Sequence, residues 1–338
     1  MSENNTTVVP TTKTKLCATI TFNWFLSDAE KFEDDEYSKP VPATFKPLVN
    51  GKEAFGLLYD KIAAAKSSVD IAIWGFQPSM YFKRDGKSLC IGDLLIKKAM
   101  EGVKVRLLLW SMAGDIQTAS EANLGGKPGV LTARSDEGVT REQVDYDTFW
   151  FYAISGELTE HQKKKEKYAT QMVEGFKGAT GYNEELLRKA GAYYMGEGVN
   201  KELLTAFNNS PLRTNLTYKT RKVAKQHNRY VHNELPDNAR GIGFRAPSHH
   251  QKTVLIDYEE PKQAVGFVME HNMLDNYWDD SEHSLNTRAP HLGKNCVTPM
   301  QDVSSIVTGQ VLWDINYNFC QSWDRQNNTQ WGTDNIET

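Results

Sequence analysis

The chain has 338 residues, of which 39% are hydrophobic and 24% charged, and its formal net charge is -4. These proportions are typical of a soluble globular protein, and the length allows one large domain or two ordinary ones with an ample core. A weakly acidic chain has no overall attraction for nucleic acid, although this balance does not exclude a local basic groove. No nucleic-acid partner is therefore expected.

The four cysteines, Cys17, Cys90, Cys296 and Cys320, are scattered and have no C-x-x-C spacing, so a zinc knuckle is not expected. No metal ion or organic cofactor is predicted. Residues 1–14 are polar and contain no apolar signal-peptide core, and no later stretch is long enough to span a bilayer. We therefore expect synthesis in the cytoplasm without a cleaved signal, and export only by a route that needs none.

Residues 1–48 are expected to form an N-terminal arm. They begin as a polar stretch, contain one candidate strand at 17–25, and end in a segment with three prolines, Pro40, Pro42 and Pro47. Proline lacks a backbone donor and interrupts regular structure. The sequence therefore predicts a loosely packed cover.

Two helix and strand pairs follow the arm. Apolar residues recur at helical spacing over 55–65 and 91–99, and the apolar runs 69–74 and 103–110 are typical of buried strands. Strands that alternate with helices in this way favour a parallel pairing through a crossover helix. The sequence therefore predicts an α/β fold.

Residues from about 111 to 212 are predicted to form a helical insertion between two strands of the sheet. The run Phe149-Trp150-Phe151-Tyr152 permits two interpretations: these aromatic residues fill a small core of the insertion, or they line a mouth that admits an apolar substrate tail. After the insertion, strands are expected near 215–218 and at 263–268. The apolar stripe over 312–323 predicts a helix that covers one face of the sheet.

The most informative stretch is 248–257, which reads Ser-His-His-Gln-Lys-Thr-Val-Leu-Ile-Asp. On a strand, His250 and Lys252 share one face, beside residues that are otherwise apolar or β-branched. A neutral imidazole can attack phosphorus, and a lysine two residues away can hold phosphate oxygens while charge develops on them. Asp257 lies an odd number of residues from His250, so we expect it to brace the strand or the adjoining loop.

The pattern His250-x-Lys252-x-x-x-x-Asp257 resembles the signature of the phospholipase D superfamily. Other stretches resemble the same family: 69–74 with Pro78, Asn272, Trp278-Asp279-Asp280, and Pro299-x-x-Asp302 followed by Gly309. The resemblance implies that residues 49–338 form a phospholipase D-like half-domain with a mixed, mostly parallel sheet flanked by helices. The insertion at about 111–212 would lie within it.

The resemblance also assigns roles to individual residues. His250 would form a covalent phosphohistidine, or act as the acid and base partner of another histidine that does. Lys252 and Asn272 would bind the phosphate, and Asp257 completes the motif. In relatives a downstream carboxylate orients the imidazole; Glu282 or Asp280 would take that part here, and Glu282 is favoured.

The sequence departs from the family pattern in two ways. Met269-Glu270 stands where the family keeps a pair of small residues, and a carboxylate that points inward there would repel a phosphate. Members of the family also need two His-x-Lys motifs that face each other, whereas this chain has only one with the full spacing. The second motif would come from a homodimer mate or from the C-terminal half of the same enzyme, and the second alternative is preferred.

Within the superfamily, the chain is most similar to the phospholipase D-type lipase effectors of bacterial type VI secretion, on segments 248–257, 266–269, 271–274 and 277–278. This resemblance implies an antibacterial toxin that hydrolyses membrane phospholipids in the periplasm of a target bacterium. An immunity protein and the secretion apparatus would be its further partners.

Two alternatives stay open: a homodimeric nuclease of the same superfamily, and a catalytically silent binding module. A nuclease should present a groove of Lys and Arg, whereas a lipase should have an apolar mouth near His250.

Overall fold

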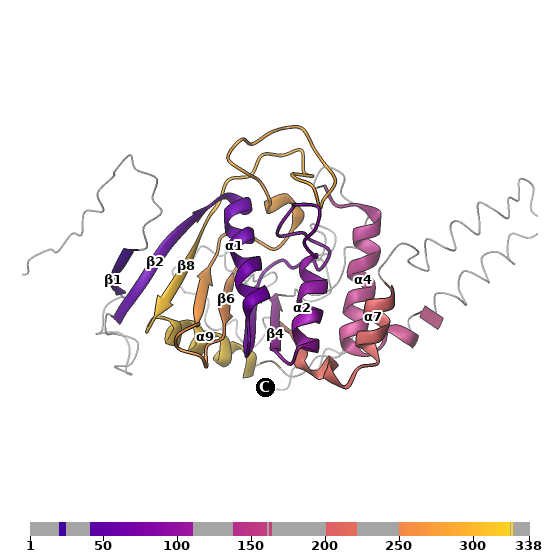
Figure 1. Ribbon diagram of the computed structural model, residues 1–338, viewed down its shortest axis with the longest axis horizontal. Helices are drawn as coiled ribbons and strands as arrows, with labels where there is room; N and C mark the ends of the chain where they lie inside the picture. Colours follow the sequence, from indigo (N-terminus) through magenta and orange to yellow (C-terminus); the bar gives the residue numbers. More distant parts are fainter. Residues whose placement is uncertain are drawn as a thin grey trace, which may run out of the picture.

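The computed structural model describes residues 20–24, 41–110, 138–160, 162–163, 201–221, 250–324 and 326. Its centre is a mixed sheet with the strand order β1-β2-β8-β7-β6-β3-β4-β5 (Figure 1). The strands are β1 (Ile20–Trp24), β2 (Val41–Val49), β3 (Ser68–Ile73), β4 (Lys104–Trp110), β5 (Leu216–Arg221), β6 (Thr253–Ile256), β7 (Val265–Val268) and β8 (Val303–Gly309).

Helices cover both faces of this sheet, as Figure 1 shows. One face carries α1 (Asn50–Ala64), α2 (Ile91–Met100), α4 (Arg141–Ser155) and α7 (Lys201–Asn208), and the other carries α9 (Leu312–Asp324). The alternation along β3 divides its side chains accordingly: Ile71 lies in the core beneath α1 and α2, whereas Ala72 contacts Phe319 of α9. None of the helices within the described ranges is long and apolar enough to cross a membrane.

The predicted α/β class with a mixed, helix-flanked sheet is confirmed, but the expectation of a mostly parallel sheet is wrong. Among the described strands, β3–β4 and β4–β5 pair in parallel, and the other five neighbouring pairs are antiparallel. The parallel pairs are those whose connections contain helices, α2 in the first and the insertion in the second. The turn from β6 to β7, which joins one of the antiparallel pairs, is too short for a crossover.

The expectation of a loose cover is wrong for residues 41–48, because β2 pairs with β8 over seven positions and Leu48 is fully buried. The prolines fit this strand. Pro42 pairs with β1 but not with β8, and Pro47 pairs with β8 but not with β1. Each proline can therefore direct its missing donor toward the side without a partner strand.

The insertion between β4 and β5 contributes α4, α7 and the 3-10 helix η5 (Pro211–Asn215). Phe149, Trp150 and Phe151 are buried in the same core as α1 and α2, so they do not line an open mouth. Gly92 of α2 permits this packing, because a Cβ atom there would lie 2.8 Å from Nε1 of Trp150. Much of the predicted helical insertion, residues 111–137, 161 and 164–200, lies outside the described residues.

Candidate active site

His250 lies where the chain enters β6, at the end of the sheet where β3 and β4 finish. The predicted strand begins at Thr253, later than the sequence suggested, although the carbonyl of Lys252 still accepts from the amide of Met269 at 2.9 Å. The exposed imidazole of His250 rests on Trp74, with ring centroids 4.6 Å apart, and Trp74 stacks on Trp110 at 5.4 Å. An aromatic wall therefore supports His250 on one side.

Lys252 is buried, with only 6% of its surface exposed. Its Nζ atom donates to the carbonyl oxygen of His250 at 3.3 Å, and within the described ranges no carboxylate forms an ion pair with it. A buried ammonium without a counter-ion is costly unless it binds an anion. Lys252 is therefore suited to hold an anionic group beside His250.

Asn272 is buried at the same end of the sheet, just after β7. Its Oδ1 atom accepts from the amide of Gly75 at 3.2 Å, and Gly75 follows Trp74 directly. Because Oδ1 faces Gly75, the Nδ2 amide is the group available as a donor to a ligand. The fold thus brings together the three residues that the sequence assigned to phosphate chemistry, His250, Lys252 and Asn272.

Asp257 lies at the opposite end of β6 from His250. Its carboxylate accepts from the backbone amides of Lys66, Ser67 and Ser68 at 2.8 to 3.1 Å. Burial by itself raises the pKa of Asp257, but these hydrogen bonds outweigh it and hold the pKa below the usual range. This carboxylate fixes the turn between α1 and β3, which matches the bracing role expected from its position.

No contact joins Glu282 to His250 among the described residues, so the orienting role expected for Glu282 finds no support in the geometry. Its segment is bound to the first turn of α1, where the amide of Lys52 donates to the carbonyl of Asp279 at 2.9 Å. Glu282 itself is exposed and lines a surface pocket of about 690 Å³, together with Asp280 and Arg288. The long loop after Asn272 carries both carboxylates over α1 instead of over β6.

Two other carboxylates, Glu270 and Asp302, lie within electrostatic reach of the site. The pKa of Asp302 is raised, by burial first and then by the charge of Glu270, while Lys252 opposes the rise. The sequence contained a signal for both, since Asp302 was part of the family resemblance and Glu270 was a departure from it. Neither was assigned a role, because the number of residues that separates them from His250 does not reveal whether their side chains point toward it.

A second histidine, His271, is fully buried beside these groups. Its Nδ1 atom lies 2.7 Å from Oγ of Ser304, and its ring meets the ring of Phe55 edge-on at 5.4 Å. Burial, together with the charge of Lys252, lowers the pKa of His271 to about 4. The side chain is therefore neutral at physiological pH and adds no second cation near Lys252.

Partial burial and the charge of Lys252 lower the pKa of His250, and Glu270 opposes them. We expect Lys252→Met to raise the pKa of His250, because it removes a nearby cation, and Glu270→Gln to lower it further, because it removes an anion. An NMR titration of the imidazole protons, assigned with His250→Ala, measures both shifts. In Glu270→Gln the acid limb of any activity profile should consequently move to lower pH. Shifts of the same sign in both variants would contradict this arrangement of charges.

The fold and these side chains define an α/β half-domain with a histidine, a lysine and an amide gathered at one end of its sheet. No protein-family model matches the chain. Phospholipase D alpha 2 of Oryza sativa subsp. japonica is 31% identical over 102 residues, which cover 23% of this chain and 12% of that protein. Phospholipase D alpha 2 of Arabidopsis thaliana is 30% identical over 322 residues, which cover 85% of this chain and 30% of that protein.

Among solved structures, Nuc, a phospholipase D family member from Salmonella typhimurium, is 9% identical with a TM-score of 0.35. The alignment covers 85% of this chain and 99% of that one. The chain spans less than a third of the length of either plant relative. The sequence matches place it in the phospholipase D superfamily, as a half-domain with one His-x-Lys-x-x-x-x-Asp motif.

Proposed function

We propose that this chain supplies one half of a phospholipase D-type phosphodiesterase that hydrolyses membrane phospholipids. The observation that carries the proposal is the buried ammonium of Lys252, which forms no direct ion pair within the described ranges and lies beside His250, at the end of the sheet that also carries Asn272. A phosphodiester would contact the ammonium of Lys252 directly, as no carboxylate in the described ranges does, and the lowered pKa of His250 keeps the imidazole in its nucleophilic form.

In the proposed reaction, an imidazole nitrogen of His250 attacks phosphorus and the bond to the head-group oxygen breaks. A second histidine, from the facing half, gives its proton to the departing alcohol. Water then attacks the phosphohistidine and passes a proton back to the second histidine. This step releases phosphatidic acid and restores His250. Each assisted proton transfer contributes roughly a hundredfold to ten-thousandfold in rate. Alternatively, His250 is the acid and base partner and the facing histidine is the nucleophile.

The second half is a partner by this proposal, either the C-terminal half of the same enzyme or a second copy of this chain. Lys252 and Asn272 hold the phosphate oxygens in both cases. The two arrangements differ in mass, which light scattering of the active species measures.

A lipid fits the surroundings of His250 better than a nucleic acid does. Trp74 and Trp110 form the aromatic wall, and Val268 at the end of β7 is 40% exposed. The carboxylates of Glu270 and Asp302 lie near Lys252 and His250, and they disfavour a polyanion more than a single phosphodiester, because each further phosphate adds to the repulsion. These features favour an isolated phosphodiester that carries apolar chains.

The proposal predicts that the assembled enzyme releases phosphatidic acid from vesicles of phosphatidylcholine and phosphatidylethanolamine, and that His250→Ala lowers the rate at least a thousandfold, since nucleophile and acid-base roles both require the imidazole. Phosphorus NMR of the products measures the rate. His291→Ala is a matched control, because His291 is exposed and packs on Tyr81, outside the site. Cleavage of DNA but not of vesicles would favour the nuclease, and equal rates in His250→Ala would exclude the proposed role of that residue.

A narrower proposal is that the enzyme is delivered into the periplasm of a target bacterium and acts there as a toxin. It rests on the resemblance of segments 248–257, 266–269, 271–274 and 277–278 to secreted lipase effectors. The assembled enzyme, directed to the periplasm of a susceptible strain, should then stop growth, and the same protein with His250→Ala should not. Unimpaired growth with active enzyme in the periplasm would argue against the toxin role.

A further inference from the structure

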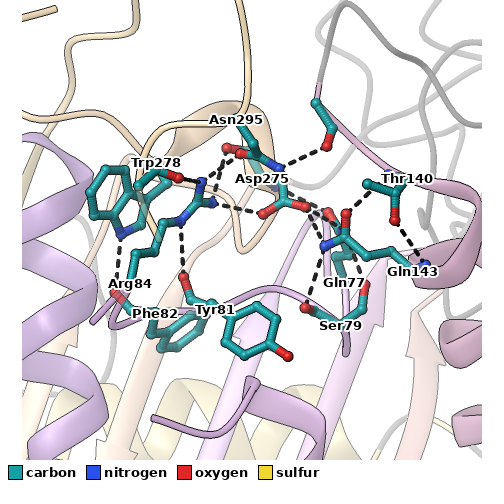
Figure 2. Close-up of polar contacts among 12 residues, drawn as sticks. Gln77, Ser79, Tyr81, Phe82, Arg84, Thr140, Gln143, Asp275, Trp278 and Asn295 are labelled. Carbon is teal, nitrogen blue, oxygen red and sulfur yellow. Dashed lines mark hydrogen bonds and ion pairs between the residues drawn. The ribbon is translucent and has the colours of Figure 1, made fainter. Parts of the chain in front are cut away.

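A buried ion pair joins the segment after β3 to the segment after β7. Nη2 of Arg84 lies 2.7 Å from Oδ1 of Asp275, and the two side chains are 1% and 0% exposed. The guanidinium also lies 4.5 Å from the ring centre of Trp278 and donates to the side chain of Asn295 and the carbonyl of Gly293 (Figure 2). The ion pair is therefore fully enclosed and well supplied with partners.

The other oxygen of Asp275 accepts from two glutamine side chains. Nε2 of Gln77 donates to Oδ2 at 2.8 Å, and Nε2 of Gln143 donates to the same atom at 2.6 Å. Gln143 belongs to the first turn of α4 in the insertion, whereas Gln77 lies just beyond β3. Figure 2 shows both amides directed at the one carboxylate. Asp275 thus connects three segments that are distant in sequence.

A short chain of hydrogen bonds continues from this carboxylate to Asn272. The amide of Asp275 donates to Oε1 of Gln77 at 3.0 Å, and the amide of Gln77 donates to the carbonyl of Met273 at 2.8 Å. The amide of Met273 donates to the carbonyl of Gly75 at 3.1 Å, and the amide of Gly75 donates to Oδ1 of Asn272 at 3.2 Å. The orientation of the Asn272 amide therefore depends on the position of Gly75, which the ladder of Gln77 and Met273 fixes.

We propose that helix α4 of the insertion positions the phosphate-binding amide of Asn272 through Gln143, Asp275 and Gln77. These three are positioning residues, since they act through Gly75 and do not touch the substrate. The inference rests on the proposed phosphodiester site and adds that the insertion is coupled to that site. A shift of α4 changes the hydrogen bonds of Asp275, and through Gln77 it displaces the backbone that holds Asn272.

The chain offers a matched pair of variants for separating this coupling from the stability of α4. Gln143 also closes a capping box, in which Thr140 Oγ1 accepts from the amide of Gln143 and Gln143 Oε1 accepts from the amide of Thr140. Gln143→Met removes the donor to Asp275 and weakens the cap. Thr140→Ala weakens the cap but retains the donor to Asp275.

Two measurements on each variant test the proposal: the affinity for inorganic phosphate by calorimetry, and the hydrogen-exchange rate of the Gly75 amide by NMR. We expect Gln143→Met to weaken phosphate binding about fivefold, as one lost buried hydrogen bond would, and to speed exchange at Gly75. Thr140→Ala should leave both near the wild-type values while lowering Tm by the part of the loss that belongs to the cap. Lys252→Met marks complete loss of phosphate binding.

The outcomes separate the two proposals. If wild type binds no phosphate, the proposed phosphate site fails, yet the exchange rates at Gly75 still test the coupling. If wild type binds phosphate and Gln143→Met matches Thr140→Ala in both measurements, the coupling through Asp275 is refuted while the site survives. If Gln143→Met, but not Thr140→Ala, shows faster exchange of the Gly75 amide and weaker phosphate binding, the coupling through Asp275 is established.

Discussion

Replacing Lys252 by methionine should abolish phosphate binding and reduce phospholipid hydrolysis by about a thousandfold without lowering the stability of the fold. Methionine retains most of the length and apolar surface of the lysine stem but lacks the charge. Loss of a preorganised charge that faces developing negative charge costs on the order of a hundredfold to a thousandfold in rate. Within the described ranges Lys252 forms no direct ion pair, and although the exchange gives up its attraction for Asp302, it relieves the desolvation of a buried ammonium.

The informative result is the combination of lost activity with an unchanged or higher Tm, because a lysine that is buried for function reduces stability in the absence of its ligand. Lys262→Met is the matched control, since Lys262 is exposed on the turn before β7. It should change neither activity nor Tm appreciably. A Tm that falls by many degrees in Lys252→Met would identify a structural lysine, and retained hydrolysis would remove Lys252 from the site.

The sequence predicted those elements whose apolar residues recur locally. Helices α1 and α2 and strands β3 and β4 follow from spacing alone, because each buries a periodic face in one core. Strand β8, with the sequence Val-Ser-Ser-Ile-Val-Thr-Gly, was not predicted, and neither was β2. β2 pairs with β1 and β8, and β8 pairs with β2 and β7, and this long-range register leaves little trace in a local pattern.

The candidate site divides in the same way. His250 and Lys252 were singled out because they alternate along a strand whose other residues are apolar or β-branched, whereas Asn272 was named only through the family resemblance. The role of Glu282 stays a prediction, because this residue lies in a long loop, where spacing does not determine direction. The pair Arg84–Asp275 was missed because its members are 191 positions apart and neither belongs to a motif.

Loss of Arg84 should be the most destabilising single change among the predictions for this chain. Arg84→Met leaves Asp275 as a buried carboxylate without a cation, and breaking a buried pair in this way costs about 3–5 kcal/mol of unfolding free energy. Urea denaturation measures the loss. Lys83→Met is a neighbouring control, because Lys83 pairs with Asp60 on the surface, where an ion pair contributes roughly 0–1 kcal/mol.

The pH dependence of this loss identifies its cause. Burial raises the pKa of Asp275, and Arg84 opposes the rise, so removing Arg84 should raise the pKa well above its value in the unfolded chain. When a group has a higher pKa in the folded state than in the unfolded chain, the folded state binds more protons between the two pKa values. The protein therefore loses stability as pH rises through the folded pKa of that group. The deficit of Arg84→Met should therefore be larger at pH 7 than at pH 5.

Adding Asp275→Leu to Arg84→Met should remove that pH dependence, because no buried carboxyl then remains to be protonated at the former ion pair. It should also recover part of the stability, since an apolar pair avoids the desolvation of an isolated charge. The double variant still leaves the amides of Gln77 and Gln143 without their acceptor, so recovery should be incomplete. A deficit that is independent of pH in Arg84→Met itself would instead attribute the loss to the cation-π contact with Trp278 and to packing.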